Sequence, residues 1–139
     1  MREIKFRAWN SKDKHMFQIA RFDLADYTVY SHLFACEGYL GESLKIMQYT
    51  GLHDKRGIDI YEGDVIAWLD IPIGEEQGQM LTDVVIFENG CFRTKKYKEL
   101  ISNLITGSNG FMNSRGEYYF LKKHETEVIG NIYEVEESQ

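Results

Sequence analysis

The chain has 139 residues, of which 43% are hydrophobic and 14% aromatic, and its formal net charge is −6. This length and apolar content allow one compact domain with a real core and argue against wholesale disorder. No apolar run approaches the roughly 20 residues needed to cross a bilayer. The first residues also lack the apolar segment of a signal peptide, so we expect a cytoplasmic protein with no membrane partner.

The first 49 residues are expected to form a β extension. Residues 4–9 alternate apolar and polar side chains, which is the period of a half-buried strand, and residues 16–22 are the expected return strand after a polar turn. Residues 26–34 and 43–50 are also rich in strand-forming residues. We therefore divide the chain into an N-terminal β extension, 1–49, and a second domain, 50–139. One continuous domain over 1–139 is the alternative.

Two glycine-marked corners open the second domain. Asp54 is placed so that its side chain can bond the turn backbone, and Gly57 supplies a positive φ angle. Ile58 and Ile60 are then expected on one face of a short strand. Residues 61–64 form the second corner around Gly63, and residues 64–69 form the next strand.

A hairpin, a helix and a second hairpin are expected after the polar loop 70–80. Asn89 and Gly90 lie between two strand-like runs, which is the strongest short-range hairpin signal. Apolar residues recur at helical spacing within 95–106, with Thr94 placed to cap this helix and Gly107 placed to stop it. Residues 111–123 indicate a hairpin around 113–116. The last expected strand covers residues 126–135, with Gly130 marking a bulge.

The acidic corner is the sharpest candidate for chemistry. A histidine and clustered carboxylates can hold a hard cation or act as acid and base; here they are His53, Asp54, Asp59, Glu62 and Asp64. The competing interpretation is that these residues form turns and solvated positions, since Asp is favoured beside turn glycines. We favour the turn interpretation, so we expect no catalytic residue, no metal and no cofactor, and keep Asp54, Glu62 and Asp64 as weak metal candidates. A catalytic pair of a histidine with a carboxylate stays open.

A short basic segment is the candidate for nucleic-acid binding. Basic side chains flank Tyr97 and could grip a single strand; they are Arg93, Lys95, Lys96 and Lys98. Tyr97 belongs to the apolar stripe of the expected helix, however, and lysines at a helix start usually lie on a solvated face. Residues 51–90 also carry nine acidic and only two basic groups, which would repel phosphate. Nucleic acid is therefore a disfavoured partner.

Three blocks of the sequence together resemble the YopX family of phage and prophage proteins. They are "REIKFRAW" at the start, "MQYTGLHDKRGIDIYEGDVI" at the centre and "EVIGNIYE" near the end, so the resemblance spans almost the whole chain. The residues that match the family's central motif are Thr50, Gly51, Leu52, Asp54, Gly57, Tyr61, Glu62, Gly63 and Asp64. His53 stands where a lysine or another variable polar residue is expected, which weakens a catalytic role for it. The resemblance implies an SH3-type barrel and carries over no catalytic residue.

The expected fold is therefore mainly β: a small SH3-type barrel with one inserted amphipathic helix, at about 95–106, and an N-terminal β-hairpin extension. The expected function is that of a non-enzymatic binding or assembly module, encoded by a phage or prophage and working in the bacterial cytoplasm. Its partner would be an unidentified phage or host protein. The alternatives are a metal-dependent hydrolase or nuclease that uses the acidic corner, and a nucleic-acid-binding accessory protein.

Self-association is also expected. Small barrels leave edge strands, and the chain has many aromatic residues for one small core. Some of these aromatic side chains should stay exposed in a monomer: Trp9, Phe17, Phe22, Tyr27, Tyr30, Tyr39, Tyr118 and Phe120. The N-terminal extension is the expected contributor to a homo-oligomer.

Overall fold

The computed structural model describes residues 2–31, 38–39, 43–72, 74–106, 110–112, 114–116, 118–120 and 126–137. Side chains are not described for residues 38–39, 106, 110–112, 118–120 and 135–137. The chain divides into two compact units, Met1–Gly51 and Leu52–Gln139. Each unit is described by itself below.

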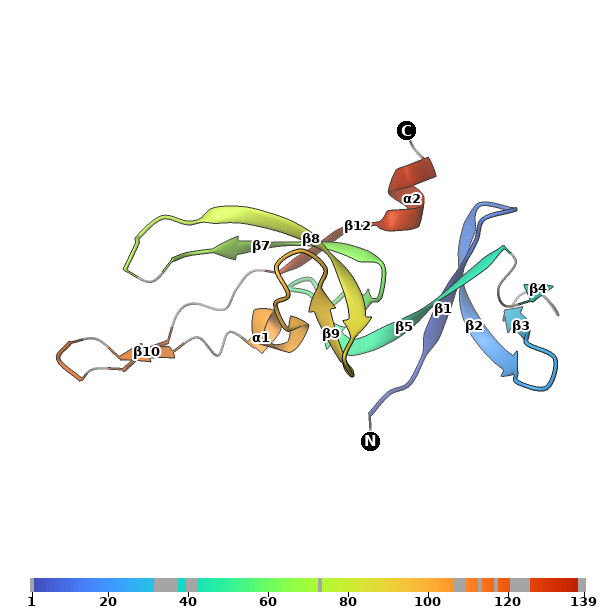
Figure 1. The fold of residues 1–139 in the computed structure, drawn as a ribbon, viewed down its shortest axis with the longest axis horizontal. Helices are drawn as coiled ribbons and strands as arrows, with labels where there is room; N and C mark the ends of the chain where they lie inside the picture. The colour runs from blue at the N-terminus through green and yellow to red at the C-terminus, as the bar shows by residue number, and fades with distance from the viewer. Residues whose placement is uncertain are drawn as a thin grey trace. The chain divides into compact units, whose positions relative to one another are not determined.

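The first unit is an antiparallel sheet with the strand order β4-β3-β2-β1-β5 (Figure 1). Its strands are β1 (Phe6–Asn10), β2 (His15–Asp23), β3 (Thr28–Ser31), β4 (Gly38–Tyr39) and β5 (Leu44–His53). The last two residues of β5, Leu52 and His53, belong to the second unit. The expected N-terminal hairpin is confirmed, since β1 pairs with β2 from Arg7 opposite Gln18 to Asn10 opposite His15. The side chain of Asn10 fixes the turn because its oxygen accepts the backbone N–H groups of Lys12 and Asp13.

The buried residues of the first unit come mainly from β1 and β5. They include Ala8, Trp9, Val29, Leu44, Met47 and Tyr49. Trp9 is only 5% exposed, so it does not belong with the exposed aromatic residues that we expected, whereas Tyr27 is 57% exposed as expected. Phe17, Phe22 and Tyr30 are half-buried. The side chains of Tyr39, Tyr118 and Phe120 lie outside the described residues.

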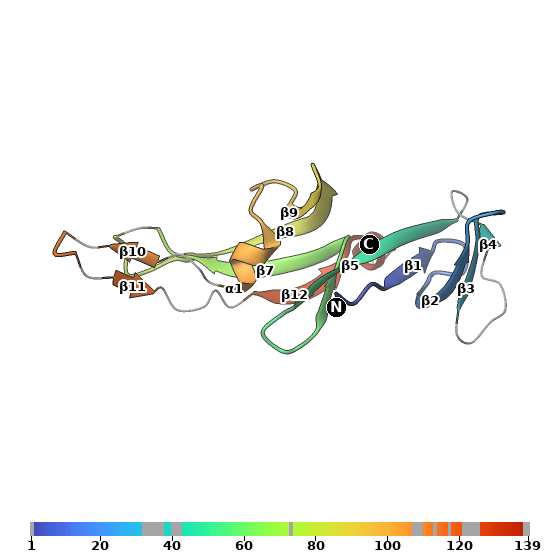
Figure 2. The ribbon, with the colours of Figure 1, turned by 90° about the horizontal axis from the view of Figure 1, so that it is seen from below.

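The second unit is built on a four-stranded antiparallel sheet, with the order β12-β7-β8-β9 (Figure 2). Its strands are β7 (Asp64–Asp70), β8 (Gln79–Glu88), β9 (Cys91–Thr94) and β12 (Glu127–Asn131). A short strand, β6 (Asp59–Tyr61), is the neighbour of β5, and β10 (Gly110–Met112) pairs only with β11 (Tyr118–Phe120) among the described strands. The mainly β class is confirmed. The described strands form open sheets and no closed barrel, so the SH3-type barrel stays a prediction.

The predicted turns of this unit are present. Asn89 and Gly90 both have positive φ angles, 52° and 79°, which a two-residue type I′ hairpin turn requires. The hairpin of β10 and β11 is confirmed by their antiparallel pairing. The register of β12 against β7 shifts between Val128 and Gly130, so the bulge expected at Gly130 is also present.

The helix is shorter than we predicted. It is α1 (Ile101–Thr106), whereas residues 95–98 form a turn and Lys98 has a φ angle of 60°. Thr94 does not cap a helix at residue 95, because its hydroxyl accepts the N–H of Glu99. The carboxylate of Asp83 accepts the N–H groups of Lys96 and Tyr97, which holds these residues in the turn. Gly107, the expected stop, lies outside the described residues.

The predicted last strand also ends early. Strand β12 stops at Asn131, and residues Ile132–Glu137 form a second helix, α2. The side-chain oxygen of Asn131 accepts the N–H of Tyr133 at 3.0 Å, which is the contact of an N-cap residue. No helix in the described part of the chain is long and apolar enough to cross a membrane.

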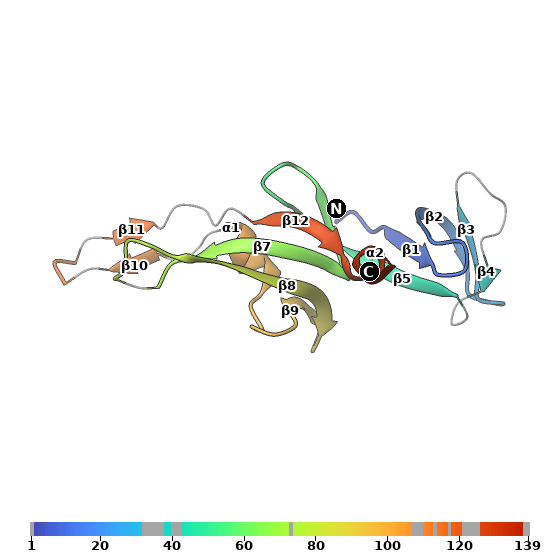
Figure 3. The ribbon, with the colours of Figure 1, turned by 90° about the horizontal axis from the view of Figure 1, so that it is seen from above.

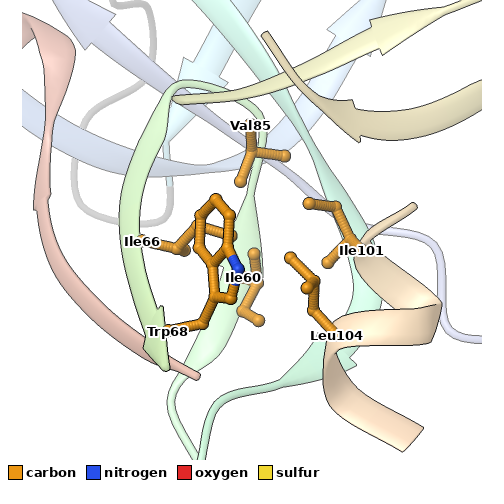
Figure 4. Close-up of a cluster of buried hydrophobic side chains, with 6 residues drawn as sticks. All are labelled: Ile60, Ile66, Trp68, Val85, Ile101 and Leu104. Carbon is orange, nitrogen blue, oxygen red and sulfur yellow. The ribbon is translucent and has the colours of Figure 1, made fainter. Parts of the chain in front are cut away.

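The core of the second unit lies between one face of the sheet, strand β6 and α1. Six buried side chains meet there, as Figure 4 shows: Ile60, Ile66, Trp68, Val85, Ile101 and Leu104. Ile101, Leu104 and the partly buried Ile105 are residues of the helical stripe that pack in this core. Ile58 was expected beside Ile60, but it is 43% exposed and precedes β6, because it belongs to the first glycine corner.

Candidate functional site

The first glycine corner is organised around the carboxylate of Asp54. This side chain is fully buried. One oxygen, Oδ1, accepts the backbone N–H groups of Arg56 at 2.8 Å and Ile58 at 2.9 Å. Gly57 has a φ angle of 83°, as predicted, and its N–H donates to the backbone oxygen of Asp54. The corner is therefore a tight turn closed on an aspartate.

The second oxygen of Asp54 binds a strand that is distant in sequence. Oδ2 accepts the N–H of Val128 in β12 at 3.0 Å. Burial is the largest influence on this carboxyl and raises its pKa, but the hydrogen bonds from Val128, Ile58 and Arg56 and the charge of Arg56 together outweigh it. The pKa of Asp54 is therefore lowered, and the group is ionised at neutral pH.

Residues next to Asp54 bind the same strand and the residue that precedes it. The N–H of Lys55 donates to the backbone oxygen of Thr126 at 3.0 Å, and Nη2 of Arg56 donates to that of Val128 at 2.6 Å. Arg56 and Lys55 also pair with the Glu127 carboxylate, at 3.4 and 3.5 Å. In the sheet order β12 is an edge strand, with β7 as its neighbour on one side and no described strand on the other. The corner therefore satisfies backbone groups on the edge strand that could otherwise pair with another chain.

The second corner binds the other end of β12. Gly63 has a φ angle of 82°, as expected, and its backbone oxygen accepts the N–H of Ile132 at 2.9 Å. Asp64 is 1% exposed; its Oδ2 accepts the N–H of Tyr61 at 2.8 Å, and its Oδ1 accepts Nδ2 of Asn131 at 3.4 Å. We call the two corners, residues 54–58 and 61–64, together with β12 the β12 clamp.

The remaining motif residues lie around this clamp. Thr50 and Gly51 lie in β5, and Gly51 has a φ angle of 85°. Leu52 packs against the core cluster of the second unit, and Tyr61 is buried at the end of β6. Glu62 is half-buried and forms the turn of the second corner together with Gly63. The matched motif thus combines core positions with turn positions.

The carboxylates of the acidic corner do not gather into one centre. Within the described ranges, no group of three or more His, Cys, Asp or Glu residues could hold a metal ion. Asp54 and Asp64 bind separate sets of backbone and amide groups, as above. His53 and Asp59 do meet, with Nε2 and Oδ1 at 3.0 Å, on side chains that are 55% and 29% exposed. The structure therefore brings one histidine and one carboxylate of the acidic corner together, at a partly exposed position.

The basic segment covers the end of β9, where Arg93 lies, and the turn between β9 and α1. Lys95 and Lys96 are exposed there, but Arg93 donates to the sulfur of Cys91 at 3.1 Å, and Nζ of Lys98 pairs with Glu88 at 2.9 Å. Tyr97 is 37% exposed and makes an edge contact with buried Trp68, with 5.7 Å between the ring centroids. Nζ of Lys96 also lies 5.1 Å from the centroid of the Tyr97 ring, so three of the four predicted basic side chains make contacts within the protein.

Sequence reasoning missed the residues in and just before β12 that contact the two corners. Thr126, Val128 and Asn131 lie far from the corners in the chain, and nothing in the local pattern shows which turn they contact. Asn131 does carry one local signal, because an Asn directly before an apolar helical turn is a favoured N-cap. Asp83, which fixes the basic turn, carries no comparable signal.

The comparisons with known proteins agree with the sequence resemblance. A family model described as "YopX protein" matches residues 5–137. The crystal structure of protein EF1440 from Enterococcus faecalis is similar over 99% of both chains, with a TM-score of 0.61 and 22% sequence identity. At this identity the likeness concerns the fold alone. No curated protein matches the chain.

Proposed function

We propose that this chain, which belongs to the YopX protein family, is a non-catalytic binding or assembly module. One observation carries the proposal: the two most buried carboxylates of its acidic corner, Asp54 and Asp64, bind the backbone and amide groups of the β12 clamp. Both side chains are buried and their oxygens already accept hydrogen bonds, which disfavours the binding of a metal or a substrate proton there. We therefore infer that the motif segment stabilises the fold and that binding takes place on exposed surfaces elsewhere on the chain.

The rest of the proposal follows the sequence resemblance. The module is encoded by a phage or prophage, works in the cytoplasm of the bacterial host and self-associates or binds a phage or host protein. Exposed apolar side chains on both units support a role in binding, since such groups are common at interfaces when they are contiguous. Leu24 is 72% exposed, Met80 60% and Ile129 54%.

The rival function is a metal-dependent hydrolase at the acidic corner. Thermal unfolding with Mg²⁺, Mn²⁺, Ca²⁺ or Zn²⁺ separates the two, because an ion bound only by the folded state raises its stability by about 2.7 kcal/mol at a hundredfold excess over Kd. We expect no concentration-dependent rise in Tm. A rise that is lost in Glu62→Gln and kept in Glu134→Gln would support the rival. Glu62 is the better probe, because substitutions of Asp54 or Asp64 remove contacts of the fold itself.

A nucleic-acid-binding accessory role is the other alternative. It is favoured only by Lys95 and Lys96, which are exposed beside Tyr97. Since Lys98 is paired with Glu88, the local positive charge is small, and we place this role below the binding module. Binding to a single-stranded DNA oligonucleotide, measured by fluorescence anisotropy over a salt series, tests it. Micromolar affinity at physiological salt would reverse this ranking.

A further inference from the structure

The β7–β8 hairpin is apolar on both of its faces. Residues that pair directly across an antiparallel sheet share a face, so Ile66 opposite Asp83 and Trp68 opposite Leu81 define the core face. The intervening positions define the opposite side, which we call the outer face: Val65, Ala67, Leu69, Met80, Thr82, Val84 and Ile86. All of them except Thr82 are apolar. A sheet face that meets water usually carries polar side chains at these positions.

The outer face is incompletely covered. Helix α1 packs on the core face through Ile101 and Leu104, and in the view from above β7 and β8 pass in front of α1 (Figure 3). On the outer face, Met80 is 60% exposed and Thr82 is exposed. Val65, Leu69, Val84 and Ile86 are half-buried, and Ala67 is only 7% exposed. The apolar row along the hairpin therefore keeps surface available to a partner.

Charge is distributed unequally along this row. At the β9 end, Arg93 pairs with Ile86 and so lies on the outer face, and the N–H of Lys95 continues the ladder by donating to Val84. At the opposite end, the 71–78 loop joins β7 to β8 and carries Glu75 and Glu76, both exposed. Glu88 shares the outer face at the β9 end and forms an ion pair with Lys98, so the net positive charge of that end comes from Arg93 and Lys95. The apolar row thus has a basic end and an acidic end.

This pattern is complementary to itself. A two-fold axis through the middle of the hairpin exchanges its two ends. It would set the acidic loop of one copy against Arg93 and Lys95 of the other, and Met80 against Ile86. At about 3.4 Å per residue the distance from Met80 to Ile86 is roughly 20 Å, so both pairs of ends can meet at the same time.

We propose that the outer face of β7–β8 is the interface of a two-fold symmetric homodimer. The occupant of the face is a second copy of this chain, in antiparallel orientation. The inference rests on the proposed function, because it names the surface through which the module self-associates. It places that surface in the second unit rather than in the N-terminal extension.

Light scattering coupled to size-exclusion chromatography over a dilution series tests the proposal. The parent should approach twice its 16.3 kDa mass at high concentration. Met80→Asp should raise the dimer Kd at least tenfold, since each dimer gains two buried charges. Leu24→Asp is the matched control: it changes an exposed apolar residue of the first unit and should leave Kd unchanged. Circular dichroism of both variants verifies that they fold.

The charged ends supply a second, independent test. Lys95→Glu should weaken the dimer, and the addition of Glu75→Lys and Glu76→Lys to the same chain should restore it. A monomer at every concentration overturns the proposal. A dimer that persists in both Met80→Asp and Lys95→Glu shows that the chain self-associates through another surface and overturns this interface. A metal-dependent rise in Tm would instead contradict the proposed non-catalytic function and would say nothing against the dimer.

Discussion

Replacement of Asp54 by alanine should strongly destabilise the second unit. The carboxylate accepts three backbone N–H groups, from Arg56, Ile58 and Val128, so alanine leaves three donors without their acceptor. Hydrogen bonds to charged groups contribute about 1.5–3 kcal/mol each, but turn N–H groups can regain water. We therefore expect a loss of roughly 2–4 kcal/mol in the free energy of unfolding. The Arg56 ion pair adds little, because that side chain is 47% exposed.

Equilibrium urea unfolding of the parent and Asp54→Ala measures this loss. The free energy of unfolding of Asp54→Asn should lie between those of the parent and Asp54→Ala. Its amide oxygen can still accept the N–H groups of the turn, whereas its amide nitrogen faces the N–H of Val128, which is also a donor. Asp59→Asn is the control, since Asp59 lies in the same segment and contacts the exposed side chain of His53. If Asp54→Ala unfolds within about 0.5 kcal/mol of the parent, the clamp does not hold the strand as we argue.

The pH dependence of the same variants checks the sign of the effect. Because the pKa of Asp54 is lowered in the folded protein, its contribution to stability is present above the pKa of the unfolded chain, about 4. This contribution is lost as the pH falls through the lower pKa of the folded state. The parent should therefore lose more stability on acidification than Asp54→Asn does. Equal acid sensitivity of the two proteins would contradict an ionised, hydrogen-bonded Asp54.

Three further outcomes are expected. Gly63→Val should cost more than about 1 kcal/mol in urea unfolding, because valine is strained at a φ angle of 82°, and a variant that unfolds like the parent would show that the corner tolerates a side chain. Gly78→Ala should destabilise the β7–β8 hairpin in the same assay, because its Cβ would lie 2.2 Å from the backbone oxygen of Asp70. Replacement of Lys95 and Lys96 by alanine should leave the salt dependence of any weak DNA binding nearly flat, and an unchanged steep slope would place that binding elsewhere.

Turns and strands could be predicted from the sequence where the residues of one short segment determine the local structure. Gly57, Gly63 and Gly90 occupy positive φ angles that few other residues tolerate, so all three turns are where we expected them. The strands around these turns followed from their alternating or apolar patterns. The turn-forming interpretation of Asp54 is likewise a local inference, and its contacts with Arg56 and Ile58 agree with it.

Tertiary contacts account for what the sequence did not predict. The helical stripe begins at Tyr97, but Asp83, from another strand, binds the backbone of Lys96 and Tyr97 and holds a turn there. Val128 in β12 likewise donates its N–H to the second oxygen of Asp54, and nothing within the 54–58 segment indicates that contact. Which residues make these contacts depends on the tertiary arrangement of the strands. The local periodicity of a single sequence does not determine that arrangement.

The central claim, that the glycine corners hold β12, is tested most directly by amide hydrogen exchange at Val128. Its N–H is bound by a side chain, Oδ2 of Asp54. We predict that this amide is protected in the parent and exchanges much faster in Asp54→Asn, while the amide of Val85 in the interior of the sheet remains protected in both. Exchange of the parent Val128 amide at the rate of an unstructured peptide would contradict the clamp.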